Sequence, residues 1–308
     1  MAQSPGLTPN ASFSALNYVL FAFLCLFWGS TWIALKTGVA ALPPFFFAST
    51  RFGAAGLLLF LATLATREFK KAHWRLVGEI LLPTILMISV NYGLMAWGLT
   101  RVSLGVSAVV NLSTVALSTN FFSMVWGQTP VSPARIASLG LGVSGLGLLF
   151  LPGIQAAPDA PTWVGILAIA AGACCYGAGS VLLRERSVDA PPRVLSALQS
   201  MIGGGALFLF TLWKEPIHAS TWSALVTPPV FWGWVFLVLV GSVLAFTLYL
   251  TLLPRWGAAR VASYAFICPV IALAEGMLFA GEKISTLEGA ATLVLLSATW
   301  LGLRLDGK

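Results

Sequence analysis

The sequence predicts an all-α integral membrane protein, with ten transmembrane helices arranged as two inverted-topology five-helix repeats. Composition is the first observation behind this prediction. Hydrophobic residues make up 58% of the 308-residue chain, charged residues make up only 9%, and the mean hydropathy is +0.90. A soluble domain carries about 25% charged residues, so this chain has too few to cover a water-facing surface. The other two observations are the length of its apolar runs and an internal repeat.

The apolar runs are long enough to cross a bilayer, which takes about 20 residues of helix. Short polar turns separate ten of these runs. Proline pairs at Pro43-Pro44, Pro191-Pro192 and Pro228-Pro229 favour helix starts, where a missing backbone N–H costs little. The predicted spans are residues 17–38, 43–65, 75–98, 102–125, 133–151, 162–183, 193–213, 231–252, 258–280 and 285–303.

An internal repeat divides the ten runs into two sets of five. Residues 96–128 align without a gap on residues 250–282, at an offset of 154 positions. A second match sets residues 28–36 against residues 176–184. Because each half has an odd number of spans, the second half enters the membrane from the opposite side. Such an inverted repeat is typical of alternating-access transporters.

Positive charges predict the orientation of the chain. Twelve Lys and Arg residues lie in loops on the side of the N-terminus, four lie on the other side, and Arg51 lies within a span. This excess predicts that both termini are cytoplasmic. The predicted organisation is a cytoplasmic flexible tail at 1–16, a first repeat with helices 1–5 at 17–151, an external linker at 152–161, and a second repeat with helices 6–10 at 162–304.

No metal or cofactor site is predicted. The four cysteines lie inside apolar runs, without the paired spacing in polar surroundings that a zinc site or a disulfide framework needs. Residues 140–145 match the GxGxxG pattern, but they lie in an apolar run with no preceding strand or acidic partner. They therefore predict close helix packing rather than dinucleotide binding. The chain has no basic run with interleaved aromatic residues, so no nucleic-acid partner is expected.

Polar and aromatic side chains at membrane depth are the candidates for a substrate site, because burying such groups in hydrocarbon is costly. An asparagine amide has four bonding sites to satisfy, and Glu275 could take a proton or pair with a cation. The alternative is structural: hydroxyls bond to their own helix backbone, and aromatic rings pack in the core. The candidate substrate-binding residues are Trp28, Trp32, Asn91, Tyr92, Asn111, Ser113, Tyr176, Ser242, Tyr249, Tyr264 and Glu275.

Two further residues within spans, Arg51 and Pro269, interrupt the apolar pattern. Arg51 lies eight residues into the second predicted helix. Its favoured role is to satisfy helix-end carbonyls or a lipid headgroup, and the alternative is to hold a substrate carboxylate. Pro269 is expected to kink the ninth helix and to free a carbonyl toward the cavity.

Short motifs stand at regular places along the spans. They are Phe27-Trp28-Gly29-Ser30 with Lys36, the pair Arg51-Phe52, Gly127-Gln128, Gly257-Ala258-Ala259-Arg260, Pro269 and Gly281-Glu282. With these motifs the chain resembles the drug/metabolite transporter (DMT) superfamily, EamA type, over residues 17–304. It departs from that family at Val115, where the first repeat often has proline, and at Gln128, where it often has glutamate.

Within the superfamily the chain is similar to YddG-like aromatic amino acid exporters. The resemblance implies a secondary transporter of the bacterial inner membrane that exports a broad range of amino acids by alternating access. It also implies a central cavity lined by helices 1, 3, 4, 6, 8 and 9. We expect a monomer in the lipid bilayer, with small-molecule substrates, no cofactor and no nucleic-acid partner.

From the residues alone, other substrates and other classes stay open. Aromatic rings, amides and hydroxyls would suit a zwitterion with an apolar side chain, but also another small metabolite or an amphipathic drug. A membrane-embedded enzyme would need clustered His, Asp or Glu, whereas His73 and His218 both lie in predicted loops. A channel would need symmetric rings of polar side chains around a pore. We therefore expect a carrier that is not an enzyme.

Overall fold

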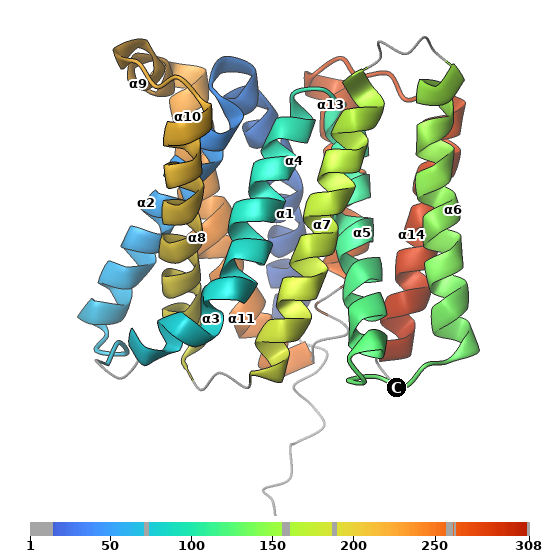
Figure 1. Ribbon diagram of the computed structural model, residues 1–308, viewed down its shortest axis with the longest axis horizontal. Coiled ribbons are helices and arrows are strands. Elements are labelled where there is room, and N and C mark those ends of the chain that lie inside the picture. The colour runs from blue at the N-terminus through green and yellow to red at the C-terminus, as the bar shows by residue number, and fades with distance from the viewer. Residues whose placement is uncertain are drawn as a thin grey trace, which may run out of the picture.

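The computed structural model describes residues 15–70, 74–155, 161–186, 190–256, 261 and 263–306. Within these ranges every regular element is a helix, which confirms the predicted all-α class (Figure 1). The elements are α1 (Ala15–Ala41), α2 (Pro44–Ala65), α3 (Leu76–Thr84), η3 (Ile85–Val90), α4 (Asn91–Leu99), α5 (Leu104–Val125), α6 (Pro133–Gln155), α7 (Pro161–Glu185), α8 (Pro192–Lys214), α9 (Ala219–Leu225), α10 (Pro228–Phe236), η4 (Leu237–Leu244), α11 (Ala245–Trp256), α13 (Tyr264–Phe279) and α14 (Thr286–Asp306).

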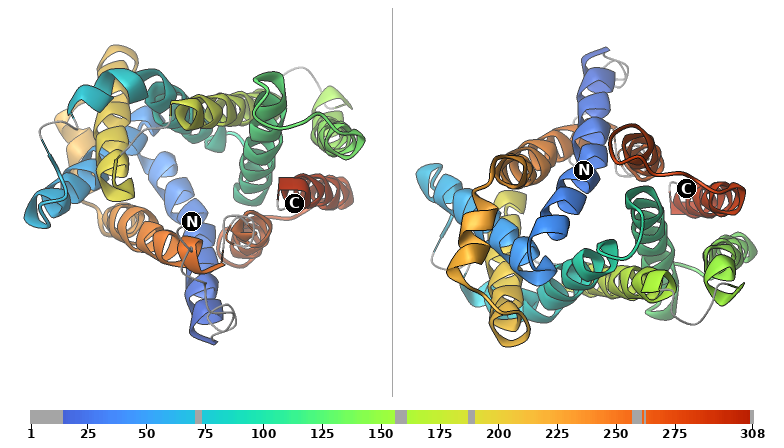
Figure 2. Two further views of the ribbon diagram at one scale, coloured as in Figure 1. Left: turned by 90° about the horizontal axis from the view of Figure 1, so that it is seen from below. Right: turned by 90° about the horizontal axis from the view of Figure 1, so that it is seen from above.

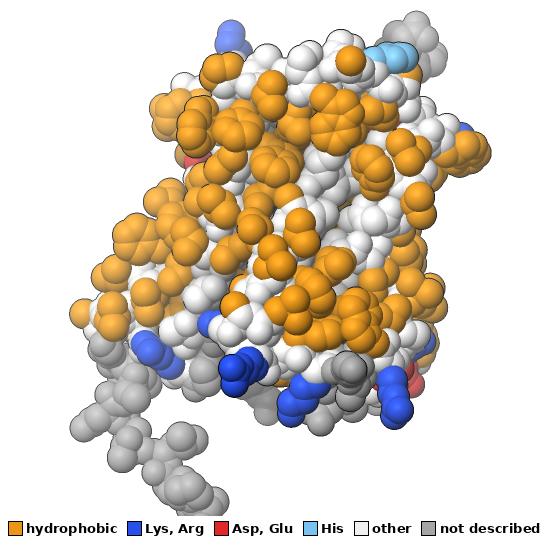
Figure 3. All heavy atoms as spheres, turned by 90° about the vertical axis from the view of Figure 1, so that its left-hand side faces the viewer, with side chains coloured by type: hydrophobic (Ala, Val, Ile, Leu, Met, Phe, Trp, Pro, Cys, Tyr) orange, Lys and Arg blue, Asp and Glu red, His pale blue; other side chains and the backbone are white. Residues whose placement is uncertain are grey.

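The surface of the bundle fits a membrane. Seven helices of the described chain are long and apolar enough to cross a bilayer. Three shorter apolar helices accompany them, at Pro133–Leu149, Tyr264–Phe279 and Thr286–Leu301. Figure 3 shows apolar side chains spread over the middle of one face, with Lys and Arg gathered toward its lower end. A wide apolar surface bounded by charges is suited to lipid, so the predicted membrane class is confirmed.

The helices are grouped around an interior, with one pair set apart. The contacts pair α2 with α8, α5 with α7, α1 with α13, and α6 with α14. The pair of α6 and α14 lies at one edge of the bundle, outside the other helices (Figures 1 and 2). The helices that remain surround the interior from several sides, so each of them can contribute side chains to a central site (Figure 2).

Prolines and glycines set many of the helix ends. The predicted proline pairs begin α2, α8 and α10, and Pro43 and Pro191 hold extended conformations at φ/ψ of −53°/128° and −54°/136°. At helix C-termini, Gly127 follows α5 with φ of 69°, and Gly281 follows α13 with φ of 65°. This left-handed conformation, which glycine adopts without a Cβ penalty, commonly ends a helix.

Two spans contain a π-helical segment that the sequence analysis did not predict. The span Leu76–Leu99 passes through η3 between α3 and α4, and η4 lies between α10 and α11. A π segment widens the helix locally, because its backbone hydrogen bonds join residues five apart instead of four. Such segments are often found at functional sites. Both segments adjoin residues of the cavity described below.

Several predicted boundaries differ from the structure. Of the predicted tail at 1–16, positions 1–14 lie outside the described residues, and α1 already includes positions 15 and 16. The predicted linker at 152–161 is shorter, because α6 continues to Gln155 and α7 begins at Pro161. The residues between them, 156–160, lie outside the described part of the chain. The segment between the predicted spans 193–213 and 231–252 contains the short helix α9.

Glycines allow α2 and α8 to approach closely. A Cβ added at Gly56 would lie 2.7 Å from the backbone nitrogen of Met201, and one at Gly204 would lie 2.8 Å from the backbone nitrogen of Gly53. Small residues at a helix interface let backbones meet where lipid offers no hydrophobic gain. This packing fixes the position of α2, which carries Arg51.

Candidate functional site

A cavity of about 370 Å³ lies inside the bundle. It is lined by side chains of α1, α2, α4, α5, α7, α8, η4, α11 and α13, so helices from both halves of the chain build it. Arg51 is the only lining residue with a formal charge in the described chain. The volume falls within the range of ordinary small-molecule sites, which is about 300–1,000 Å³.

Nine of the eleven candidate residues line this cavity. They are Trp28, Trp32, Asn91, Tyr92, Asn111, Tyr176, Ser242, Tyr249 and Tyr264. The structure places the other two, Ser113 and Glu275, away from the lining. Ser113 is buried in α5, and Glu275 accepts a hydrogen bond from the Ser30 hydroxyl and thereby joins α13 to α1. Glu275 therefore has a helix-joining contact rather than a place in the cavity wall.

Three aromatic rings from α1, α11 and α13 form one wall of the cavity. The ring centres of Trp28 and Tyr264 lie 4.5 Å apart, and those of Trp28 and Tyr249 lie 5.7 Å apart. The indole Nε1–H of Trp28 donates to the carbonyl oxygen of Gly241 in η4, at 3.1 Å. This bond fixes the indole, and the three rings offer π faces to a ligand.

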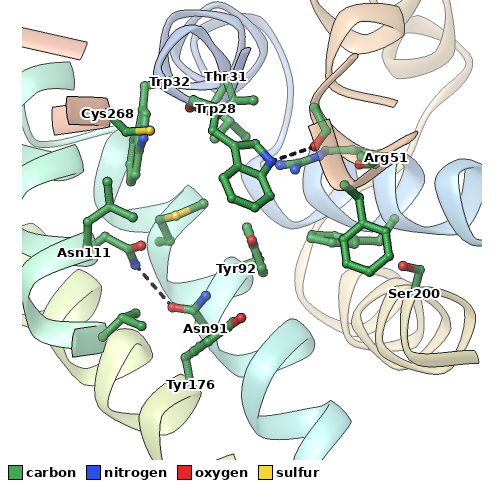
Figure 4. A pocket seen from close by; sticks show the side chains of 18 of the residues that line it. Trp28, Thr31, Trp32, Arg51, Asn91, Tyr92, Asn111, Tyr176, Ser200 and Cys268 are labelled. Atoms are coloured by element: carbon green, nitrogen blue, oxygen red, sulfur yellow. Dashed lines mark hydrogen bonds between the residues drawn. The ribbon is translucent and has the colours of Figure 1, made fainter. Parts of the chain in front are cut away.

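A pair of amides forms another part of the wall. Asn91 is the first residue of α4, directly after η3, and Asn111 lies in α5. The Nδ2 of Asn111 donates to the Oδ1 of Asn91 at 3.3 Å, and both residues are buried (Figure 4). One bond uses one donor and one acceptor of the pair, so further bonding capacity remains for a ligand.

Arg51 is the cation of the cavity. Arg51 is 6% exposed, and its guanidinium carbon lies 4.8 Å from the ring centre of Phe52 and 5.4 Å from that of Tyr92. Nε and Nη1 are buried, with no hydrogen-bond partner among the described residues. The role favoured from the sequence, at helix-end carbonyls or a lipid headgroup, is therefore wrong. Arg51 is buried and lies in the cavity wall (Figure 4).

Sequence reasoning missed the contribution of α2 and α8. Besides Arg51, the cavity is lined by Phe52 of α2 and by Ser196 and Ser200 of α8, which were not among the candidates. The two serines are four residues apart, and so they lie on one face of their helix. That spacing is the signal that could have identified them.

Polar contacts close the end of the bundle where α4 meets α5. The Lys36 ammonium of α1 donates to the carbonyl oxygens of Leu99 at 2.8 Å and Val102 at 2.7 Å. The Glu282 carboxylate, after α13, accepts from the backbone N–H groups of Leu104 and Gly105. Lys36 thereby fastens α1 to the end of α4 and to the turn at residues 100–103, which we call the α4–α5 turn, and Glu282 fastens the residues after α13 to the start of α5.

The start of α2 is held in the same way. The Glu215 carboxylate, directly after α8, accepts from the backbone N–H groups of Phe45 and Phe46, at 2.9 and 2.7 Å. Burial raises the pKa of Glu215, and the two N–H donors offset part of that rise. A carboxylate at a helix N-terminus satisfies donors that have no partner in their own helix.

Two proteins with similar sequences are named as transporters. The chain is 28% identical to the uncharacterized transporter YvbV of Bacillus subtilis over 90% of this chain and 88% of that protein. It is 29% identical to the uncharacterized inner membrane transporter YedA of Escherichia coli over 92% of this chain and 88% of that protein. A WAT1-related chloroplastic protein of Arabidopsis thaliana is 24% identical, with coverage of 97% and 72%.

A solved crystal structure shares the fold, with a TM-score of 0.62 and 19% identity over 95% of this chain and 98% of the other. The model of the EamA-like transporter family matches residues 16–151 and again residues 163–304. These two matches cover most of the chain, including every residue that lines the cavity. The chain therefore belongs to the EamA-like transporter family, a family of multi-pass membrane transporters.

Proposed function

We propose that this membrane transporter exports amino acids, aromatic ones among a broad range, by alternating access through the central cavity. The observation that carries the proposal is the composition of the lining: aromatic rings on one side, an amide pair on another and, among the described residues, a single formal charge. An amino acid zwitterion with an apolar side chain is complementary to such a lining. The similarity to YddG-like exporters, drawn from the sequence motifs, supports the same substrate class.

The aromatic wall suits both ends of an aromatic amino acid. An ammonium group over the face of Trp28, Tyr249 or Tyr264 gains about 0.5–2 kcal/mol from cation–π attraction. An aromatic side chain can pack against the same rings in offset or edge-to-face geometry. The amides of Asn91 and Asn111 can then orient the polar end by hydrogen bonds.

We further propose that the two halves form an inverted repeat with five spans each. The offset of 154 positions carries Gly127 onto Gly281, and both glycines have positive φ after their helices. The same offset carries residues 85–90 of η3 onto residues 239–244, which lie within η4. The double match of the family model, once in each half, supports the same repeat. Exchange of conformation between two such halves is a route to alternating access.

We propose that the chain is a monomer of the bacterial inner membrane, with both termini in the cytoplasm. Support for the orientation comes from the helices: α1 begins and α14 ends at the same end of the bundle (Figure 1). Lys and Arg gather toward that end on the face in Figure 3, as the positive-inside rule expects of a cytoplasmic side. The similarity to YedA of Escherichia coli, which is named an inner membrane transporter, supports the inner membrane.

A neutral metabolite or an amphipathic drug is the second candidate substrate. The aromatic wall would accept either of them by apolar contact. An amphipathic drug that carries a positive charge is less favoured than a neutral metabolite. Arg51, the one charged lining residue among those described, would repel it.

Counterflow in proteoliposomes tests the proposed function. Vesicles are loaded with unlabelled phenylalanine, threonine, methionine, a neutral sugar or a drug cation, and uptake of labelled phenylalanine is followed. The proposal predicts saturable uptake that internal amino acids stimulate and that protein-free vesicles lack. Linear, non-saturating uptake would indicate a channel. Absence of stimulation by any amino acid would overturn amino acid export and favour the second candidate.

A further inference from the structure

Arg51 presents a buried, unpaired cation to the central cavity. The residue is only 6% exposed, and its Nε and Nη1 have no hydrogen-bond partner in the described part of the chain. The other charged side chains of the described residues lie outside the cavity lining. Arginine keeps its charge in proteins, so the guanidinium is a positive group with no anion beside it among the residues that the structure describes.

A buried charge normally requires a partner, because the protein interior cannot replace the water that the charge has lost. The rings of Phe52 and Tyr92 lie within cation–π distance of the guanidinium and compensate for part of this loss. The two rings do not satisfy the N–H donors. These donors lie at the edge of the guanidinium, and a π face is a weak hydrogen-bond acceptor. An anionic ligand in the cavity would balance the charge of the guanidinium.

We propose that Arg51 binds the carboxylate of the transported molecule, so that the site selects substrates with a free carboxylate over their amides and esters. This inference deepens the proposed function, since it rests on transport through the same cavity and names the group that is recognised. The guanidinium fork matches the two oxygens of a carboxylate and binds them with parallel charge-assisted hydrogen bonds.

The charge balance of the cavity favours a carboxylate over a phosphate. One carboxylate neutralises the single formal charge of the lining, whereas a phosphate dianion would leave an excess negative charge in a largely apolar site. Figure 4 shows the Arg51 side chain reaching from α2 toward Trp28, with Ser200 on the same side of the cavity. A carboxylate at Arg51 therefore leaves the rest of the molecule facing the aromatic wall and the amide pair.

Three related ligands separate the groups of the substrate. Phenylalanine carries both a carboxylate and an ammonium group, phenylalaninamide lacks the carboxylate, and phenylpyruvate lacks the ammonium group. Affinity is measured from the concentration of each ligand that raises the thermal unfolding midpoint of the purified full chain. The proposal predicts that phenylalanine and phenylpyruvate bind the wild type at least about tenfold more tightly than phenylalaninamide, the range expected for charge-assisted bonds.

The variants test whether Arg51 is the source of this preference. In Arg51→Gln the preference of phenylalanine over phenylalaninamide should disappear, whereas Arg51→Lys should keep part of it. Because the ratio is taken within one variant, a general loss of stability does not imitate the result. Arg101→Gln is the control, since Arg101 stacks on Trp97 outside the cavity lining, with its guanidinium carbon 3.6 Å from the ring centre. It should keep the wild-type preference.

The outcomes separate the two proposals. Equal binding of phenylalanine and its amide by the wild type overturns the role of Arg51 and leaves amino acid export standing. This holds even if Arg51→Gln does not fold. An undiminished preference in a folded Arg51→Gln also overturns it. If phenylpyruvate binds and phenylalanine does not, the result supports the carboxylate site and overturns amino acid export. If none of the three ligands binds, both proposals are overturned.

Discussion

The carboxylate of Glu282 accepts a hydrogen bond from the backbone N–H of Leu104, 178 positions earlier in the chain, at 2.5 Å. Its other oxygen accepts from the N–H of Gly105 at 3.2 Å. The two bonds join the turn after α13 to the start of α5, where the first N–H groups have no partner in their own helix. Lys36 fastens α1 to the end of α4 and to the adjoining α4–α5 turn. Four elements therefore meet at this end of the bundle through charged side chains and backbone groups.

Replacing Glu282 with alanine should lower the thermal unfolding midpoint of the purified protein. Each charge-assisted hydrogen bond contributes about 1.5–3 kcal/mol, and the variant leaves two backbone donors of α5 without an acceptor. Lys283→Ala is the control, since this neighbouring side chain is exposed and its loss should change the midpoint little. Equal midpoints for Glu282→Ala and Lys283→Ala would show that the contact does not hold α13 to α5.

Alanine at Gly204 should destabilise the protein, whereas alanine at Gly205 should not. A Cβ at Gly204 would lie 2.8 Å from the backbone nitrogen of Gly53, while one at Gly205 meets no atom within 4 Å. The backbone of α2 would have to move, and overpacking of this kind costs about 1–3 kcal/mol or more. Thermal unfolding midpoints of the two variants in detergent measure the difference. Equal stability of Gly204→Ala and Gly205→Ala would show that the backbones of α2 and α8 are not in close contact at Gly204.

Glu215 should make stability depend on pH. Burial raises its pKa in the folded protein, so the folded state favours the protonated form relative to the unfolded chain. The contribution is fully present below the ordinary glutamate pKa of about 4.3 and is lost as pH rises through the raised value. Relative to Glu215→Gln, the wild type should lose stability over this window. Thermal midpoints of both proteins, taken across the mildly acidic range, test the sign, and a difference that grows in favour of the wild type with rising pH would contradict it.

Asn111→Ala should weaken transport by raising the half-saturation concentration for phenylalanine about tenfold. The change removes a possible substrate contact and leaves the Asn91 amide, which now bonds to Asn111 at 3.3 Å, without that partner. A loss of about 1.4 kcal/mol corresponds to a factor of ten. Initial rates of counterflow measure the constant, and Ser144→Ala on the exposed face of α6 is the control. An unchanged constant in Asn111→Ala would remove the amide pair from the substrate site.

The membrane class, the approximate spans and most of the cavity lining could be predicted from the sequence. Long apolar runs indicate that the helices lie in lipid, and the polar or aromatic residues inside these runs are few enough to identify. Ser113 lies outside the cavity lining for a geometric reason: it is two positions from Asn111, and thus about 200° around the helix. Glu275 shares the helix face of Tyr264 but lies eleven residues beyond it, about 16 Å along the axis.

The position of Arg51 and the two π segments could not be predicted in this way. Whether an arginine eight residues into a span faces lipid, a helix end or a cavity depends on the neighbours of α2, and the packing of α2 against α8 decides it. A π segment changes the helical phase by one residue without any signature in composition. The sequence pattern therefore does not show which way the residues around η3 and η4 face.

Filling the cavity tests most directly whether amino acids pass through it. Ser242 lines the cavity from η4, and the indole of Ser242→Trp would occupy space that a substrate needs. Ser144→Trp places the same ring on the exposed face of α6 and serves as the control. Counterflow of labelled phenylalanine is compared for the two variants, once each has been shown to be monodisperse with a cooperative unfolding transition. We predict that Ser242→Trp abolishes exchange and that Ser144→Trp retains it, whereas wild-type exchange in Ser242→Trp would contradict transport through this cavity.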